Sequence, residues 1–333
     1  MSVTPLPTEA ILNSSTPVRP SGSPLSFLYV LLELTKPRVA TLVVFSVAAG
    51  AGLAWQNYPD LGSWTLLANA VLGTSLVAAG ASVLNQVLER SSDGLMIRTS
   101  KRPLPTGRID MLTSTLFGII LGIVGVGYLY QMANGPLAAI ASMGTLIGYV
   151  GIYTPMKRFT TTNTLIGAVP GAMPPVLGYL AIAGQWDMVA TLLFAILFIW
   201  QIPHFLAIAW MYRGQYSSAG LKMITGNDPQ GHRTSRQMVL YCLALLVVST
   251  LPGAILPPAW RPGLIYLAAS LVAGGWFLRA AVLFAMQPTD LRAKHALRAS
   301  LLHLPLVLGA WLIDPLVQPR PKPTNNHIME VHP

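Results

Sequence analysis

The chain has 333 residues, of which 53% are hydrophobic and only 10% are charged, and its mean hydropathy is +0.56. This composition is too apolar for a soluble domain and is typical of a bundle of membrane-spanning helices. The net charge of +10 could indicate nucleic-acid binding, but the basic residues lie in short loops between apolar segments. Such residues set topology and meet anionic substrates or lipid, so we expect no nucleic-acid partner. The single cysteine, Cys242, excludes an intramolecular disulfide.

The predicted elements begin after a tail rich in Pro, Ser and Thr, residues 1–25, which we expect to be disordered. Nine apolar segments follow, each near the ~20 residues that a bilayer requires. They are predicted at residues 39–55, 65–87, 112–130, 137–153, 164–183, 188–210, 239–256, 264–286 and 299–316. The expected fold class is therefore an all-α membrane protein, with nine transmembrane helices in residues 26–316 and a second tail in residues 317–333.

The loops on the two sides of these spans differ sharply in charge. Nearly all the lysines and arginines near the spans fall on one side, whereas the opposite loops hold only Arg261. The positive-inside rule places the basic side in the cytoplasm. We therefore predict a cytoplasmic amino terminus and an extracytoplasmic carboxyl terminus.

The most informative stretch is residues 85–108, between the second and third spans. Asn85, Glu89 and Asp93 recur at i, i+4 and i+8, which on an α-helix means a drift of ~40° and a rise of ~6 Å per step. Their oxygen atoms therefore share one helical face. Carboxylate and amide oxygens suit Mg²⁺, which commonly bridges protein carboxylates to substrate phosphates.

Basic residues interleave with this triplet or follow it, and guanidinium groups suit phosphate oxygens. They are Arg90, Arg98, Lys101, Arg102 and Arg108. An acidic face beside a basic loop predicts a magnesium diphosphate site. The alternative is a polar helix end whose arginines only set topology. Two acids and an amide on one face of an acid-poor chain favour the metal site.

Two further polar groups lie at the inner ends of later spans. Tyr153, Lys157 and Arg158 could bind a second phosphate and line a pocket for an electron-poor carbon. A topogenic Lys-Arg pair behind an interfacial tyrosine gives the same pattern, so the residues alone leave both readings open. His204 follows a proline inside an apolar span, where a histidine is costly unless it faces a polar cavity. His303 is a weaker candidate, because nothing polar surrounds it.

Four motifs in this order resemble those of the protohaem IX farnesyltransferases (haem O synthases), a branch of the UbiA-type intramembrane prenyltransferases. The motifs are Glu33-Leu-Thr-Lys-Pro-Arg38, the 85–108 stretch with Lys101-Arg-Pro-Leu-Pro105, Tyr153-Thr-Pro-Met-Lys-Arg158, and Pro203-His-Phe-Leu-Ala-Ile-Ala-Trp210. The Asn-xxx-Asp/Glu-xxx-Asp pattern marks the superfamily, whereas Thr-Lys-Pro-Arg and Pro-His-Phe point to the haem-modifying branch. The resemblance covers roughly residues 26–316.

This resemblance implies a nine-helix bundle around a central cavity that opens to the cytoplasmic face. It implies farnesyl diphosphate and haem B as substrates, haem O and diphosphate as products, and Mg²⁺ as cofactor. It also implies a bacterial inner-membrane enzyme, with a haem A synthase or a terminal oxidase as candidate assembly partners.

The resemblance also assigns roles to individual residues of this chain. Those for metal binding and catalysis are Asn85, Glu89 and Asp93, with Tyr153 and Lys157 as further catalytic residues. Arg158 matches the second diphosphate-facing element together with Tyr153 and Lys157. From their charge rather than from the resemblance, the further candidates for diphosphate are Arg98, Lys101, Arg102 and Arg213. Lys36, Arg38 and His204 stay alternative candidates for the partner of the haem propionates. For His204, the roles of haem ligand, hydrogen-bond donor and purely structural group all stay open.

One departure from the superfamily pattern concerns the loop after the sixth span. Members often carry a second acidic pair there, whereas this chain has Arg213-Gly214-Gln215-Tyr216. The number of bound metal ions, one or two, therefore stays open, with Asp228 as the nearest acid in that loop. Arg213 could neutralise phosphate directly, and Glu89 in place of the more usual Asp is a milder change.

Three alternatives to haem farnesylation are consistent with parts of this pattern. A sister enzyme that prenylates a quinone or chlorophyll precursor would share the diphosphate half of the site. A nine-span channel or transporter would not need an acidic triplet beside an arginine cluster. A non-catalytic haem-binding assembly factor would bind haem but not respond to Mg²⁺.

Overall fold

The structure is a computed structural model that describes residues 23–317, apart from the side chains of residues 38 and 39. Nearly all of the two expected tails therefore lies outside the described residues. The helices are α1 (Pro24–Leu34), α2 (Pro37–Asn57), α3 (Trp64–Leu95), α4 (Met111–Met132), α5 (Leu137–Ile147), the π-helix η1 (Gly148–Tyr153), α6 (Thr154–Met156), α7 (Asn163–Gly171), α8 (Met173–Ala183), α9 (Met188–Met211), α10 (Arg213–Ser218), the 3₁₀ helix η2 (Ile224–Asn227), α11 (His232–Ile255), α12 (Leu264–Met286) and α13 (Asp290–Val317).

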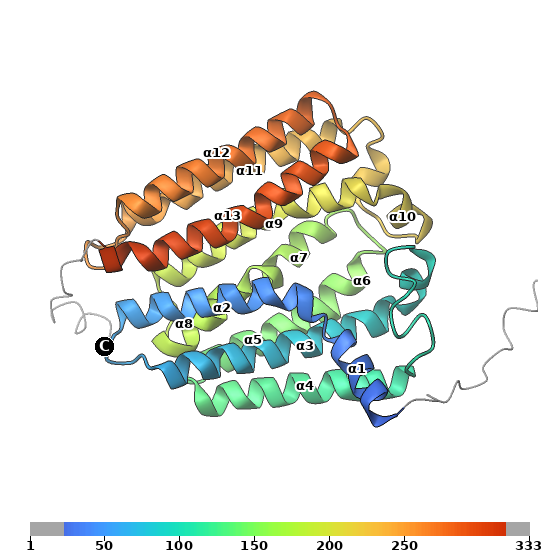
Figure 1. Cartoon of the computed structure of the whole chain (residues 1–333), viewed down its shortest axis with the longest axis horizontal. Coiled ribbons are helices and arrows are strands. Elements are labelled where there is room, and N and C mark those ends of the chain that lie inside the picture. Colours follow the sequence, from blue (N-terminus) through green and yellow to red (C-terminus); the bar gives the residue numbers. More distant parts are fainter. Residues whose placement is uncertain (1–22, 318–333) are drawn as a thin grey trace, which may run out of the picture.

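Nine helices within residues 23–317 are long and apolar enough to cross a membrane, which confirms the predicted fold class. The fourth span runs through α5, η1 and α6, and the fifth through α7 and α8. Figure 1 shows the spans side by side, with α9 and α11 to α13 on one side of the bundle and α2 to α5 on the other. The bundle places the ends of α3, α6 and α9 at the same end of the molecule.

Several helices extend beyond their apolar segments. α3 continues to Leu95, α11 begins at His232 and α13 begins at Asp290, each several residues beyond the predicted span. Hydropathy marks the lipid-facing part of a helix, whereas backbone hydrogen bonds continue the helix into the polar region. The polar extension of α3 carries Glu89 and Asp93 and thereby keeps them on one helix with Asn85.

A short helix before the first span was not predicted. α1 exposes most of its large apolar side chains, Leu25, Phe27, Leu28, Tyr29 and Leu32 among them. Its end is tied to the α3–α4 loop, because Arg108 donates to both carboxylate oxygens of Glu33 at 2.7 and 2.9 Å. Its contact with α3 fixes where the chain enters α2.

Close backbone contacts hold the centre of the bundle together. A Cβ on Gly178 of α8 would lie 2.0 Å from the carbonyl oxygen of Val47 on α2, so only glycine fits there. Small residues that let two backbones approach closely are typical of helix contacts in membranes. In lipid, van der Waals packing rather than the hydrophobic effect drives the association of helices. α2 is also joined to α13 near its carboxyl end, where Gln56 Nε2 donates to Leu312 O at 2.8 Å.

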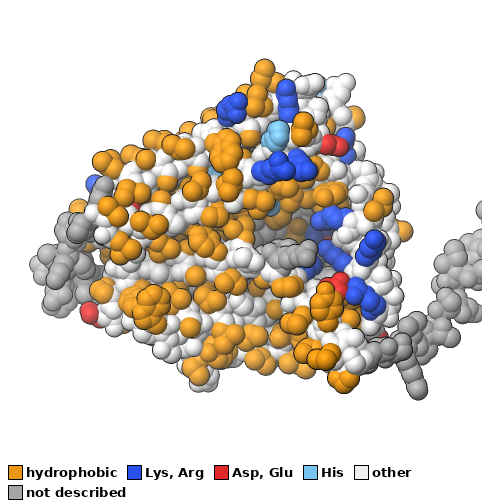
Figure 2. Space-filling view, in the orientation of Figure 1, with side chains coloured by type: hydrophobic (Ala, Val, Ile, Leu, Met, Phe, Trp, Pro, Cys, Tyr) orange, Lys and Arg blue, Asp and Glu red, His pale blue; other side chains and the backbone are white. Residues whose placement is uncertain are grey.

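Figure 2 shows a hollow on one face of the molecule, between α2 below and α9 and α13 above. Lysine and arginine side chains gather at the same end as this hollow. We call this end of the bundle the basic end; it comprises the α3–α4 loop, the α6–α7 loop and α10. The central cavity implied by the resemblance stays a prediction.

Substitution of Asp110 should lower stability in a pH-dependent way. Asp110 caps α4 by accepting from Thr113 N at 2.9 Å, and the Thr113 hydrogen bonds lower the pKa of this carboxyl. Asp110→Ala should therefore cost about 1 kcal/mol near neutral pH. Because the folded-state pKa lies below the unfolded value of about 3.9, the difference should vanish as the pH falls through the folded-state pKa. Thermal unfolding of the two proteins in detergent, at several pH values, measures it.

Candidate active site

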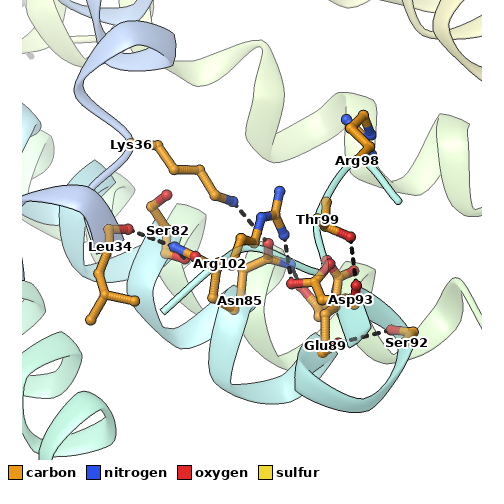
Figure 3. A network of polar contacts seen from close by, with 12 residues as sticks. Leu34, Lys36, Ser82, Asn85, Glu89, Ser92, Asp93, Arg98, Thr99 and Arg102 are labelled. Atoms are coloured by element: carbon orange, nitrogen blue, oxygen red, sulfur yellow. Dashed lines mark hydrogen bonds and ion pairs between the residues drawn. The ribbon is translucent and has the colours of Figure 1, made fainter. Parts of the chain in front are cut away.

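The predicted oxygen triplet lies on one face of α3, as the spacing indicated. Asn85 and Asp93 are 2% and 1% exposed, and the side chain of Glu89 is 12% exposed. Figure 3 shows all three on the same helix, with basic side chains converging on them from neighbouring segments. Buried carboxylates are costly unless they are paired or bind a metal ion.

Each member of the triplet is paired with a different basic residue. The pairs are Lys36 Nζ with Asn85 Oδ1 at 3.4 Å, Lys157 Nζ with Glu89 Oε1 at 2.6 Å, and Arg102 Nη1 with Asp93 Oδ2 at 2.6 Å. The three cations come from the α1–α2 junction, the residue after α6 and the α3–α4 loop. The folded chain therefore gathers three oxygen donors and three basic side chains from four segments at one point.

Lys36 is held in an uncommon backbone conformation. Its φ of 53° and ψ of 58° lie in the left-handed region, where the described chain places no other residue except glycine. Such strain persists only where the surroundings impose it, and it often marks functional sites. Gln86 helps to impose it, because its Nε2 donates to Leu34 O at 2.6 Å. Burial, and then the nearby charge of Arg102, lower the pKa of Lys36 to about 7.

The orientation of Asn85 is fixed from the opposite side by the π-helix η1. Asn85 Nδ2 donates to Thr154 Oγ1 at 3.1 Å, and Thr154 Oγ1 donates to Tyr149 O at 2.8 Å. With its amide nitrogen engaged there, Asn85 presents its Oδ1 toward Lys36. π-Helical turns are rare overall, and those that occur are often at functional sites. This one precedes Thr154 and determines where Thr154 meets α3.

Tyr153 and Lys157 belong to the same cluster. Lys157 Nζ lies 4.4 Å from the centroid of the Tyr153 ring, and the Tyr149 and Tyr153 rings are 5.3 Å apart. Burial alone would lower the pKa of Lys157, but Tyr153 and Glu89 outweigh burial and raise it above its usual range. Lys157 therefore stays charged beside a polarisable aromatic face.

Gly167 should be needed for this placement of Tyr153. A Cβ at residue 167 would lie 2.4 Å from the tyrosine ring, so Gly167→Ala should displace the ring at a cost of about 1–3 kcal/mol. We expect a loss of activity of roughly tenfold or more, because about 1.4 kcal/mol lost from the stabilisation of the transition state corresponds to a factor of ten in rate. Gly127→Ala is the matched control, because a Cβ there meets nothing within 4 Å. Equal activity of the two variants in isolated membranes would contradict this placement.

The four other basic residues predicted to bind diphosphate make no hydrogen bond to the triplet within the described chain. Arg98 donates to Tyr216 Oη at 3.1 Å and lies over the Tyr212 ring, so it joins the α3–α4 loop to α10. Arg158 is exposed and donates to Ser91 Oγ at 3.1 Å. The side chain of Lys101 is exposed.

Arg213 also contacts residues outside the cluster. Its Nη1 donates to Asp290 Oδ1 at 2.6 Å and to Trp210 O at 2.7 Å. Among the candidate diphosphate residues, Arg102 is thus the one that contacts the triplet directly.

The candidate haem residues fall in different places. Lys36 contacts the oxygen triplet, and the side chain of Arg38 lies outside the described ones. His204 lies on α9, where its Nδ1 is 2.7 Å from Ser300 Oγ of α13. His303 is 1% exposed, and neither of its ring nitrogens has a hydrogen-bond partner within the described chain.

The donor set fits one divalent cation. Asp93 Oδ1 is buried and has no hydrogen-bond partner among the described residues, so one carboxylate oxygen is free to coordinate. Together with the Asn85 and Glu89 oxygens it gives a hard, all-oxygen set, which suits Mg²⁺. No cluster of three or more His, Cys, Asp or Glu occurs in residues 23–317. Asp228 instead caps α11, accepting from Thr234 N and Oγ1 at 2.7 and 2.8 Å.

Three residues that position the site were not singled out from the sequence. Gln86 and Thr154 lie inside the quoted motifs but carry no charge, and Tyr149 acts through its backbone carbonyl. Their proximity to Asn85 and Tyr153 was the only signal in the sequence. Their partners are 52, 69 and 5 residues away, so the roles of Gln86 and Thr154 required the folded chain.

Comparison with known proteins shows the class to which the fold and site belong. The model of the UbiA prenyltransferase family matches residues 43–302. The chain belongs to this family, and it is a prenyltransferase embedded in the membrane.

Two similar relatives share one name. The protoheme IX farnesyltransferase of Solibacter usitatus (strain Ellin6076) is 41% identical over 85% of this chain and 97% of its own length. The enzyme of the same name from Opitutus terrae (strain DSM 11246 / JCM 15787 / PB90-1) is 40% identical over 86% and 94%.

Solved structures share the fold at lower identity. The chain matches a digeranylgeranylglyceryl phosphate synthase structure with a TM-score of 0.69 and 17% identity, over 87% of this chain and 98% of that one. It matches a UbiA homolog from Archaeoglobus fulgidus, bound to GPP and Mg²⁺, with a TM-score of 0.56 and 15% identity, over 85% and 99%. Metal use thus occurs in proteins with this fold.

Proposed function

We propose that the protein transfers a farnesyl group from farnesyl diphosphate to a vinyl group of haem B, giving haem O and diphosphate. The observation that carries the proposal is the buried cluster in which three oxygen donors on α3 meet Lys36, Arg102 and Lys157. The shared name of relatives that align over nearly their whole length supports the choice of substrates.

In this proposal the triplet holds the diphosphate end of the substrate. Mg²⁺ bound by Asn85, Glu89 and Asp93 would neutralise charge on the leaving diphosphate. The three basic partners would then turn from the oxygens of the triplet toward the nearby phosphate oxygens, since charge-assisted hydrogen bonds to phosphate are strong. Because these donors are already gathered at one point, they need little reorganisation as charge develops.

The reacting carbon would lie beside Tyr153. As the bond from the allylic carbon to diphosphate breaks, positive charge develops on that carbon, and the aromatic face stabilises a cation. The terminal carbon of a haem vinyl group attacks and forms the new carbon–carbon bond. Water then captures the cation left on the porphyrin side and loses a proton, which gives the hydroxyethylfarnesyl substituent.

The farnesyl chain would lie along the apolar walls of the bundle. Each CH₂ removed from water contributes about 0.8 kcal/mol, so the tail supplies binding while the polar end supplies chemistry. In this proposal the chain would enter through the hollow between α2, α9 and α13, which lies near the basic end in Figure 2.

The orientation in the membrane is part of the same proposal. The basic end faces the cytoplasm, the amino terminus is inside and the carboxyl terminus outside, in the bacterial inner membrane. A haem A synthase or a terminal oxidase is the proposed assembly partner, since either consumes the product or a haem made from it.

The function is tested by incubating purified protein with haem B, farnesyl diphosphate and Mg²⁺ and separating the haems by chromatography. The proposal expects haem O and an equal amount of diphosphate. Release of diphosphate with a quinone or chlorophyll precursor, but not with haem B, would instead identify a sister prenyltransferase.

A further inference from the structure

We infer that His204 binds the iron of the haem substrate through its Nε2 atom and so positions the porphyrin for the reaction. This inference rests on the proposed function, because it assumes that haem is the acceptor. It goes beyond that function in naming the ligand and the atom. The argument starts from how α9 and α13 hold the imidazole ring.

The ring of His204 is held in a fixed plane. It stacks on the indole of Trp200 with a centroid distance of 4.9 Å and an interplanar angle of 23°. Trp200 is itself fixed, because its Nε1 donates to Ser300 O at 2.9 Å. Phe205 contacts the imidazole edge-on at 5.4 Å. A ring held in this way is oriented before any ligand arrives.

The hydrogen bonds around Ser300 determine which ring nitrogen carries the proton. Ser300 has one hydroxyl hydrogen, and its Oγ donates it to Leu297 O at 2.7 Å. Ser300 Oγ therefore accepts the hydrogen bond from His204, whose Nδ1 lies 2.7 Å away. The neutral imidazole then has its proton on Nδ1 and a free lone pair on Nε2.

This arrangement is the one that metal-binding histidines use. A ligand histidine commonly donates its other ring N–H to a protein acceptor, which fixes the tautomer and raises the basicity of the coordinating nitrogen. Ser300 supplies that acceptor, and within the described residues Nε2 has no hydrogen-bond partner of its own. The Nε2 lone pair of this half-buried histidine is therefore available to such a ligand.

His204 is also accessible, in contrast to the other buried histidine of the same region. Its side chain is half-buried on α9, which with α13 and α2 borders the hollow of Figure 2. His303 lies one turn farther along α13 than Ser300, and its side chain is buried. Because His204 is half-buried whereas His303 is 1% exposed, a ligand can reach the ring of His204 but not that of His303.

The position of His204 along the bundle suits a positioning role. His204 lies about two helical turns from the end of α9, and Asn85 lies about three turns from the end of α3, both counted from the basic end. Both residues therefore lie within about three turns of a helix end at the basic end. Ligation at the iron leaves the vinyl groups at the porphyrin edge free to reach the farnesyl carbon.

The test uses the purified full-length protein with ferric haem B as the probe. Absorption and electron paramagnetic resonance spectra report the axial ligand, and titration gives the affinity. His204→Gly leaves room for added imidazole to take the place of the missing ring. Two controls match it: Ala207→Gly for a glycine in the same helix, and His303→Ala for the loss of a buried histidine.

We expect a nitrogen-ligated spectrum for the unaltered protein and both controls. His204→Gly should lose that spectrum, bind haem about 10- to 100-fold more weakly, and regain the spectrum with imidazole. An unchanged spectrum in His204→Gly, or one that imidazole does not restore, would overturn the inference. If the unaltered protein binds haem without nitrogen ligation, the inference alone fails. If it binds no haem at all, the proposed function fails with it.

Discussion

Asp93→Asn is expected to lower kcat by on the order of 10³-fold while the protein still folds. The substitution keeps the shape of the side chain and a hydrogen bond to Arg102, but it removes the negative charge that a divalent cation requires. Asp93 Oδ1 is the oxygen that has no partner within the described chain, so an amide nitrogen in its place removes a metal ligand, while the contact of Arg102 with the other oxygen changes from an ion pair to a hydrogen bond.

Haem O formation measured against Mg²⁺ concentration checks this expectation. Asp110→Asn is the control, because Asp110 is an exposed carboxylate near the same end that only caps α4. It should keep the activity of the unaltered protein. An Asp93→Asn variant with comparable activity would remove this residue from the metal site.

Lys157→Met should lower activity by on the order of 10²-fold, with much of the loss in the KM for farnesyl diphosphate. Lys157 is buried, lies against the Tyr153 ring and is the partner of Glu89, so the variant removes the cation nearest to the proposed reacting carbon. Lys294→Met, an exposed cation on α13, should have no effect.

A double substitution separates catalysis from the stability of the ion pair. Loss of one partner leaves the other charge buried and unpaired, which is itself destabilising. Glu89→Gln with Lys157→Met removes both charges and should restore much of the thermal stability. Activity should stay low in the double variant, because neither the metal ligand nor the cation is present. Recovery of activity together with stability would show that the pair is only structural.

The fold could be predicted from hydropathy to a large extent. The nine spans and the single helical face of Asn85, Glu89 and Asp93 followed from segment length and from the four-residue spacing. The polar extensions of α3, α11 and α13 could not be predicted in this way, since helices continue past the membrane on backbone hydrogen bonds alone. α1 was missed for a related reason, because its 11 residues are too few to span a bilayer.

The candidate site could be predicted only in part. The sequence placed Lys36 with the haem candidates. In the structure Lys36 follows α1, which Gln86 holds through Leu34 O, and its left-handed backbone brings its Nζ to Asn85 Oδ1. No local pattern encodes this, because Lys36 and Asn85 are 49 residues apart in the chain. Arg213 was grouped with the diphosphate residues, whereas its contacts are with Trp210 and Asp290. Charge alone did not reveal which arginines face inward.

The most direct test of the oxygen triplet uses Mn²⁺, a paramagnetic ion that accepts the same octahedral oxygen ligands as Mg²⁺. Pulsed electron paramagnetic resonance of the protein with Mn²⁺ and farnesyl diphosphate detects whether phosphorus nuclei lie next to the bound ion. We expect a phosphorus coupling in the unaltered protein and in Asp110→Asn, and its loss in Asp93→Asn. A phosphorus coupling that persists unchanged in Asp93→Asn would place the metal and diphosphate elsewhere and contradict the account.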